Sequence, residues 1–143
     1  MIIVVCGATA SYKTRLSVDL AKRYNGIVVN ADSLQVYKEL DIATAKIKEE
    51  EKEGVPHYLF DIVDKNDMYT VYDYQKDLRN ILDNNKDKNI IIVGGTGLYI
   101  KAGLYNYVFE DDTSYDTYDD ISNEELYEKV KEKYPNLDIH VNN

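Results

Sequence analysis

The chain opens with the run Ile2-Ile3-Val4-Val5-Cys6, which is followed directly by Gly7-Ala8-Thr9-Ala10-Ser11-Tyr12-Lys13-Thr14. An unbroken β-branched run predicts a strand buried on both faces, as in parallel sheets. The next eight residues match the phosphate-loop pattern G-x-x-x-x-G-K-[ST] at Gly7, Lys13 and Thr14. This pattern belongs between a strand and a helix. The opening of the chain therefore predicts an α/β fold with an anion-binding loop.

The loop chemistry is specific. Backbone N–H groups and the N-terminus of the following helix form a cradle for phosphate, and Lys13 would reach the terminal phosphates. Thr14 would help to hold Mg²⁺. The second glycine of the pattern is replaced by Tyr12, whose bulk we expect beside the phosphate and which is expected to open the loop. The alternative is a strand–turn–helix in which Lys13 and Thr14 are incidental.

The rest of the first 105 residues alternates strand and helix signals, which predicts a parallel sheet with helices on both faces. Further strands are predicted at Ile27–Val29, His57–Val63 and Ile90–Val93. Helices are predicted after Thr14, around 46–53, from a Thr70/Asp73 capping box onward, and over about 98–104. Asn25-Gly26 is expected to end the first of these helices.

Composition sets broad limits on the function. The chain has 143 residues, 44% of them hydrophobic, which is too many for a disordered chain. No apolar run approaches the roughly 20 residues of a membrane span, and no signal peptide is expected. A single cysteine excludes an internal disulfide. We therefore expect a soluble cytoplasmic domain, and its net charge of −9 argues at first against nucleic acid.

The charge is concentrated at one end. Residues 1–105 contain 15 acids and 14 bases, a net of −1, whereas residues 106–143 contain 11 acids and 3 bases, a net of −8. We therefore divide the chain into an α/β core, 1–105, and an acidic loop with a short helix, 106–143. A capping box at Ser122 and Glu125 predicts where that helix begins. Since the core is nearly neutral, the total charge does not decide its partner.

Two further segments follow predicted strands. Asp32 lies in Asn30-Ala31-Asp32-Ser33-Leu34-Gln35-Val36-Tyr37, after the second strand, and Gly94-Gly95-Thr96-Gly97 follows the last one. Because the carboxyl ends of parallel strands line the ligand crevice, both segments should lie beside the phosphate loop. A carboxylate there can accept a proton or hold Mg²⁺ indirectly. The alternatives are a turn-capping aspartate and a tight strand–helix turn.

Taken together with Asp41-Ile42-Ala43-Thr44-Ala45-Lys46 and Gly54-Val55-Pro56-His57-Tyr58-Leu59-Phe60-Asp61, these segments resemble the tRNA dimethylallyltransferases, also called tRNA isopentenyltransferases. The order and spacing of the segments agree across nearly the whole chain. The resemblance implies a phosphate-loop fold that holds a diphosphate leaving group. It also implies transfer of a dimethylallyl group from dimethylallyl diphosphate to the exocyclic amine of the adenosine 3′ to a tRNA anticodon.

The resemblance implies roles for single residues. Asp32 matches the proposed general base, Thr96 a residue near the reacting amine, and Lys13 the cation that neutralises the leaving diphosphate with Mg²⁺. Ser33, Leu34 and Gln35 match the segment that contacts the flipped adenosine or its neighbours. The diphosphate would be bound by the loop residues Gly7, Ala8, Thr9, Ala10, Ser11, Tyr12, Lys13 and Thr14. Tyr37, His57 and Cys6 are interpreted as packing residues.

Two departures from the family pattern keep alternatives open. Tyr12 replaces a glycine, and family members continue beyond residue 143 with an arginine-rich helix, a further core strand and much of the tRNA-binding surface. We therefore expect a C-terminally truncated sheet that self-associates through an uncovered edge and holds tRNA weakly. A phosphate-loop kinase for a small molecule or nucleotide is one alternative function. A decayed, non-catalytic paralogue is the other.

Overall fold

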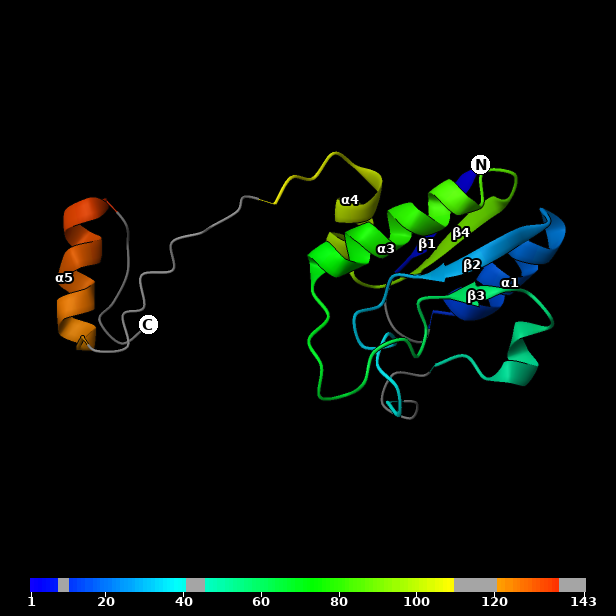
Figure 1. Cartoon of the computed structure of the whole chain (residues 1–143), viewed down its shortest axis with the longest axis horizontal. Coiled ribbons are helices and arrows are strands. Elements are labelled where there is room, and N and C mark those ends of the chain that lie inside the picture. The colour runs from blue at the N-terminus through cyan, green and yellow to red at the C-terminus, as the bar shows by residue number, and fades with distance from the viewer. Residues whose placement is uncertain (8–10, 41–45, 110–120, 137–143) are drawn as a thin grey trace. The chain divides into compact units, whose positions relative to one another are not determined.

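The computed structural model describes residues 1–7, 11–40, 46–109 and 121–136, in two compact units, Met1–Phe109 and Glu110–Asn143. Figure 1 shows the elements of the first unit wrapped around one sheet. The elements of the first unit are β1 (Ile2–Cys6), α1 (Lys13–Arg23), β2 (Gly26–Asn30), the 3₁₀-helix η1 (Glu49–Lys52), β3 (His57–Tyr58), α3 (Val71–Asn84), β4 (Asn89–Gly94) and α4 (Gly97–Leu104).

The four strands are parallel and lie in the order β1-β4-β2-β3. Cys6 pairs with Gly94, and Asn30 pairs with Val93. The last residues of β1, β2 and β4 therefore lie side by side at one edge of the sheet. This arrangement confirms the predicted α/β fold with a parallel sheet.

Alternating side chains of the central strands build a core on each face of the sheet. Ile27 and Val29 of β2 pack on the side of α3 and α4, in a cluster with Tyr74 and Leu78. Val28 points the other way and packs with Val18 of α1. Both faces of β2 and β4 are thus buried, which explains why their sequences are apolar without alternation. Helices flank both faces, as predicted (Figure 1).

The third predicted strand is shorter than expected. Pairing with β2 stops after His57–Tyr58, and not at Val63, because Leu59 and Asp61 adopt left-handed backbone conformations with φ of 62° and 55°. Such residues cannot continue a ladder. Val63 instead forms an isolated parallel bridge with Tyr37. The charged segment 46–53 likewise forms only the short η1.

The prediction that β1 is buried on both faces is wrong. β1 is an edge strand of the described sheet, and its side chains Ile2 and Val4 are 47% and 38% exposed. Cys6 is exposed as well, so it is no core thiol. An uncovered edge with apolar side chains favours pairing with another chain. Self-association through this edge stays a prediction.

The predicted helix boundaries agree closely with the structure. The Thr70/Asp73 capping box opens α3, and Asn25, with φ of 47°, follows the end of α1. In the second unit α5 (Asn123–Lys133) begins at Ser122, whose hydroxyl accepts a hydrogen bond from the Glu125 N–H. The acidic stretch 110–120 lies outside the described residues. No helix in the described part of the chain is both long and apolar enough to span a membrane.

Candidate active site

The loops that follow β1, β2 and β4 meet at the carboxyl edge of the sheet. Gly7 follows Cys6, Asp32 comes two residues after Asn30, and Gly95 follows Gly94. Since these strands are parallel neighbours, all three loops leave the sheet at the same edge. The sequence-based prediction that the phosphate loop, Asp32 and the glycine–threonine loop share an edge agrees with this topology.

Thr96 joins two of these loops. Its hydroxyl oxygen accepts a hydrogen bond from the Ser33 N–H at 3.0 Å and lies 3.3 Å from the Ser33 hydroxyl. The Thr96 N–H donates to the Ala31 carbonyl at 3.0 Å. The residues on either side of Asp32 are thus bound to Thr96. The structure thus brings Thr96 to the Asp32–Ser33 segment, which lies 63 positions away from it in the sequence.

Asn30 fixes the backbone of Asp32 from the other side. Its buried side chain accepts from the Asp32 N–H at 2.9 Å and donates to the carbonyls of Asp32 and Leu59. Asp32 Oδ1 accepts from the Leu34 N–H at 3.0 Å. Oδ2 of this half-buried carboxylate makes no hydrogen bond to any described residue. One oxygen therefore orients the carboxylate, and the other is available to a ligand.

Gly94 permits this junction to form. A Cβ at this position would lie 2.2 Å from the carbonyl carbon and oxygen of Ala31. Real Cβ atoms do not approach backbone so closely, so only glycine allows β4 and the start of the Asp32 loop to lie in contact. Gly94 is therefore required by packing within the protein.

In the phosphate loop, Tyr12 is the N-cap residue of α1 and has φ of 58° and ψ of 17°. This is the left-handed conformation that glycine adopts without cost. The Tyr12 side chain is 86% exposed, and its carbonyl accepts the Leu16 N–H at 3.1 Å. Tyr12 thus keeps a glycine-like backbone and starts the helix. The expected opening of the loop by ring bulk involves residues 8–10, which lie outside the described residues.

The neighbouring residues at the start of α1 are held by polar contacts. The Lys13 ammonium donates to the Ser11 hydroxyl at 3.3 Å, and the Ser17 hydroxyl donates to the Thr14 carbonyl at 2.7 Å. Lys13 and Thr14 are half-buried. Of the predicted loop residues, Ala8, Thr9 and Ala10 lie outside the described residues.

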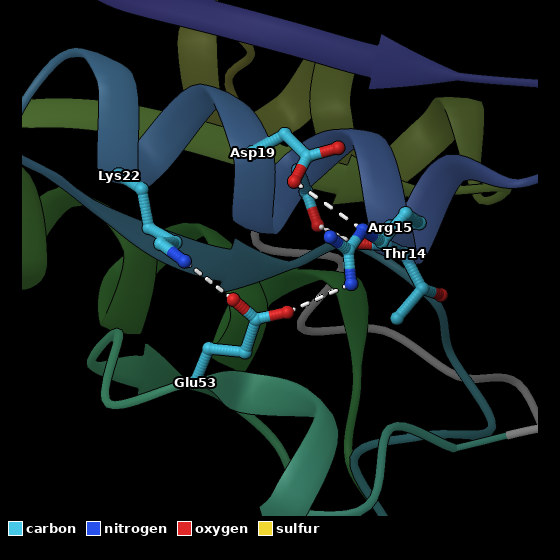
Figure 2. A network of polar contacts seen from close by, with 6 residues as sticks. Thr14, Arg15, Asp19, Lys22 and Glu53 are labelled. Carbon is cyan, nitrogen blue, oxygen red and sulfur yellow. Dashed lines mark hydrogen bonds and ion pairs between the residues drawn. The ribbon is translucent and has the colours of Figure 1, made fainter.

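A charge network that sequence reasoning missed ties α1 to the turn after η1. Figure 2 shows the Glu53 carboxylate between Arg15 and Lys22, with Asp19 on the other side of Arg15. Arg15 Nη1 lies 2.7 Å from Glu53 Oε1. These contacts lower the pKa of Glu53, chiefly through its hydrogen bond with Lys22. Residues so distant in sequence give no pairing signal in a single chain.

The other predicted residues divide into two groups. Leu34 is 55% exposed and Gln35 half-buried, in a turn beside Asp32, so both are accessible from the same edge. Tyr37 and His57 have structural contacts, as interpreted: the Tyr37 hydroxyl accepts the Tyr69 N–H, and His57 Nδ1 lies 2.7 Å from the Val55 carbonyl oxygen. Burial lowers the pKa of His57. These contacts make His57 a packing residue.

Aromatic side chains beneath the site form a support that the sequence did not indicate. Tyr99, three residues after Thr96, stacks on Tyr74 of α3 with ring centroids 4.3 Å apart. Burial is the main cause that raises the pKa of Tyr99, and the charge of Asp32 adds to it. Gly103 allows α4 to approach α3, since a Cβ there would lie 2.3 Å from Leu78. The helix that follows Thr96 is therefore packed closely against α3.

The described residues contain no group of three or more metal-ligating side chains. Mg²⁺ in phosphate sites, however, takes most of its ligands from phosphate oxygens and water. The Thr14 hydroxyl, at the N-terminus of α1, is the kind of single protein oxygen such a site needs. The residues present therefore fit a Mg²⁺ ion that binds together with diphosphate.

Known proteins with the same sequence features identify the family. The family model described as IPP transferase matches residues 35–143. The chain belongs to the IPP transferase family. It is 46% identical over 140 residues to the tRNA dimethylallyltransferase of Anoxybacillus flavithermus, covering 94% of this chain and 45% of that protein. The enzyme of the same name from Staphylococcus haemolyticus is 46% identical over 114 residues, covering 78% of this chain and 34% of the relative.

Solved structures agree with this assignment. A tRNA isopentenylpyrophosphate transferase from Staphylococcus epidermidis superposes with a TM-score of 0.70 at 39% identity, covering 99% of this chain and 50% of that one. A eukaryotic dimethylallyltransferase acting on tRNA gives 0.81 at 29% identity, covering 99% of this chain and 38% of the other. This IPP transferase chain thus spans half or less of the length of these relatives. None of the observations favours the kinase or the decayed paralogue.

Proposed function

We propose that this chain carries the central chemistry of tRNA prenylation, the transfer of a dimethylallyl group from dimethylallyl diphosphate to the exocyclic amine of the adenosine 3′ to the anticodon. What supports the proposal most is the junction of Thr96 with Ser33, which holds Asp32 at the same sheet edge as the phosphate loop. A base and an anion-binding loop at one edge suit displacement of a diphosphate by an amine. We assign the protein to the cytoplasm with its tRNA substrate.

The acceptor half of the reaction is assigned to Asp32. The adenine amine nitrogen attacks the first carbon of the dimethylallyl group, and the proton it loses passes to the Asp32 carboxylate. Asp32 Oδ1 is already bound by the Leu34 N–H, so Oδ2 is the oxygen we assign to the proton. We assign to Thr96 a positioning role through its hydrogen bonds with Ser33, and a contact with the amine. Ser33, Leu34 and Gln35 would contact the tRNA around the flipped adenosine.

The donor half is assigned to the phosphate loop. As the carbon–oxygen bond breaks, both electrons leave with the diphosphate, whose added charge is stabilised by Lys13 and the N-terminus of α1. When bound at Thr14, Mg²⁺ supplies further neutralisation of this charge. The Tyr12 backbone keeps the helix start in the conformation that directs N–H groups at an anion.

A product assay tests this proposal. The protein is incubated with labelled dimethylallyl diphosphate and an anticodon stem-loop, and nucleosides are analysed after digestion. We expect prenylated adenosine at the position 3′ to the anticodon, lost when that adenosine is replaced by guanosine. Turnover of ATP with no labelled nucleoside would contradict prenyl transfer and favour the kinase. If neither phosphate donor binds, the non-catalytic alternative is correct.

A further inference from the structure

Two residues just after β3 have an uncommon backbone conformation. Leu59 and Asp61 are left-handed, with φ of 62° and 55°. This conformation is unfavourable for a residue with a Cβ, and it persists only where the surrounding structure enforces it. Such strain is concentrated at functional sites, and the contacts of this turn lead to the candidate active site.

A buried amide joins the turn to Asp32. Asn30 is 1% exposed, and its side-chain nitrogen donates to the Leu59 carbonyl at 2.9 Å. The same nitrogen donates to the Asp32 carbonyl at 3.0 Å, and the amide oxygen accepts the Asp32 N–H at 2.9 Å. One side chain therefore holds both the strained turn and the backbone of the proposed base.

The chain that follows the turn lies along the segment to which we assign tRNA contacts. Residues 59–63 form the supporting turn, and residues 32–37 form the acceptor segment. The Asp61 N–H donates to the Gln35 carbonyl at 3.3 Å, and two further N–H groups of the turn donate to the Val36 carbonyl at 2.9 and 3.1 Å. The acceptor segment is therefore bound along its second half as well as at its first residue.

A buried lysine completes the contact between the two segments. The Lys46 side chain is 4% exposed, and its ammonium donates to the Tyr37 carbonyl at 2.8 Å and to the Asp61 carboxylate. A charge buried so deeply requires such partners. Lys46 therefore holds the last residue of the acceptor segment together with the side chain of the left-handed Asp61.

The register of the sheet shows what the left-handed turn prevents. β3 pairs with β2 at Tyr58 and Val29, so a continued strand would place Asp61 beside Asp32. Neighbouring strands lie about 4.8 Å apart, a distance at which two carboxylates repel each other. The turn instead leads the Asp61 carboxylate to Lys46.

We propose that the supporting turn positions the acceptor segment for prenyl transfer, with Asn30 and Asp61 as positioning residues that act through Asp32 and Gln35. The inference rests on the proposed function, because it concerns the base and the tRNA contacts assigned there. The left-handed conformation follows from this role, since it separates Asp61 from Asp32 and brings the turn alongside the acceptor segment.

Two variants at Asp61 separate the backbone conformation from the ion pair. Its side chain is 48% exposed, so both variants should keep the fold. Both lose the charge that pairs with Lys46, but asparagine adopts the left-handed conformation more readily than alanine. Single-turnover prenyl transfer is expressed per diphosphate-binding site. We expect Asp61→Ala to be at least threefold slower than Asp61→Asn, with KM for dimethylallyl diphosphate unchanged within twofold.

The matched control lies at the other end of β2. Asn25 is exposed and left-handed, with φ of 47°, and it precedes the first residue of β2, whereas Asp32 follows the last. Asn25→Ala makes the same asparagine-to-alanine change in the same conformation. It should lower stability in the same way and leave the transfer rate unchanged. An equal loss of rate at this position would show that the rate follows stability alone, and would overturn the inference.

Amide exchange provides a readout that does not depend on activity. The Leu34 N–H is bound by Asp32 Oδ1, so its exchange reports the geometry of the acceptor segment. We expect Asn30→Ala to accelerate this exchange about fivefold and to slow transfer at least tenfold. Asp61→Ala should accelerate it too, but Asp61→Asn and Asn25→Ala should not. If Asn30→Ala fails to fold and binds no diphosphate, the two Asp61 variants decide.

This inference and the proposed function fail in different ways. Prenylated adenosine, with equal rates and equal Leu34 exchange in the two Asp61 variants, would leave the proposed function standing and overturn the positioning role. Absence of prenylated adenosine from the wild type would contradict the proposed function. Leu34 exchange that accelerates in Asp61→Ala alone would then still support the coupling of the two segments, and equal exchange would overturn it.

Discussion

The two loops that flank the candidate site are built in opposite ways. The acceptor junction consists of Asp32, Ser33 and Thr96. Its backbone is held by hydrogen bonds from Asn30 and Thr96 and by the close packing of Gly94 on Ala31. In the phosphate loop, Tyr12 keeps a left-handed backbone although it is not glycine, and its side chain is exposed. The acceptor side is preorganised, whereas the donor side carries backbone strain.

The left-handed backbone of Tyr12 lowers the stability of the protein. Strain of this kind is worth about 1–2 kcal/mol for a residue with a Cβ, and it persists only where the rest of the structure enforces it. Here α1 enforces it, because its first hydrogen bond begins at the Tyr12 carbonyl and its charges are tied to Glu53. Variants in the two loops should therefore differ in their effects on activity and stability. We expect the largest effect at Asp32 and the smallest at Tyr12.

The largest effect is expected for Asp32→Asn. Removing the proposed base should lower prenyl transfer by about 10²- to 10⁴-fold, because an amide cannot take the proton. The Leu34 N–H keeps an oxygen acceptor, so stability should change little. Single-turnover rates with labelled donor measure the loss, and diphosphate affinity serves as the control. A variant with the wild-type rate would mean that Asp32 only caps its turn.

The next effect concerns the packing of the acceptor junction. Gly94→Ala should lower the free energy of unfolding by about 3 kcal/mol, because its Cβ overlaps the Ala31 backbone. Gly97→Ala is the matched control, since nothing lies within 4 Å of a Cβ there. It should be neutral or stabilising by up to about 1 kcal/mol. Urea unfolding monitored by circular dichroism compares them, and equal stabilities would show that the junction is loosely packed.

Loss of the Thr96 hydroxyl should have a smaller effect. Thr96→Val leaves the Ser33 N–H without its acceptor and should cost about 1–2 kcal/mol of stability. Thr96→Ser keeps the hydroxyl and should recover most of that loss. Amide exchange at Ser33 reports the bond itself and should accelerate only in the valine variant. Equal exchange rates in both variants would show that Thr96 does not hold the Asp32 loop.

The smallest stability change is expected in the donor loop. Tyr12→Gly should stabilise the protein by about 1 kcal/mol through relief of the left-handed strain, and should raise diphosphate affinity several-fold. Tyr12→Ala removes the ring but keeps a Cβ at the same backbone conformation. A gain in affinity with glycine alone assigns the penalty to the backbone, and a gain with both assigns it to the ring. Unchanged affinity in both would show that Tyr12 does not limit binding.

Most of the fold could be predicted from local signals. Some elements form through interactions between residues that are close in sequence. They are the β-branched strands at Ile27–Val29 and Ile90–Val93, the Thr70/Asp73 capping box and the turn at Asn25. The sequence could not show where β3 stops, because the left-handed Leu59 and Asp61 look like ordinary strand residues. Nor could β-branched composition distinguish a central strand from the edge strand β1, since that depends on which strands lie beside it.

For the site, the order of the parallel strands predicted which loops lie close together, but it did not predict the hydrogen bonds between them. Parallel strands place Asp32 and Thr96 at one edge, but the hydrogen bonds between Thr96 and Ser33 follow from loop conformations that only the structure describes. The same holds for Arg15 and Glu53, which are 38 residues apart. The roles that the resemblance gives to Asp32, Thr96 and Lys13 stay predictions, whereas the close packing of Gly94 became visible only from the atoms around it.

The most direct test of the central claim is calorimetric titration of inorganic diphosphate with Mg²⁺ into the wild-type protein and into Lys13→Gln. We expect saturable binding with one site per chain, weakened at least tenfold in the variant, which is a loss of about 1.4 kcal/mol of binding free energy. Lys22→Gln, which removes a lysine of α1 bound to Glu53, is the matched control and should bind as the wild type does. Absence of binding to the wild type, or binding that Lys13→Gln leaves intact, would contradict the assignment of the phosphate loop as the donor site.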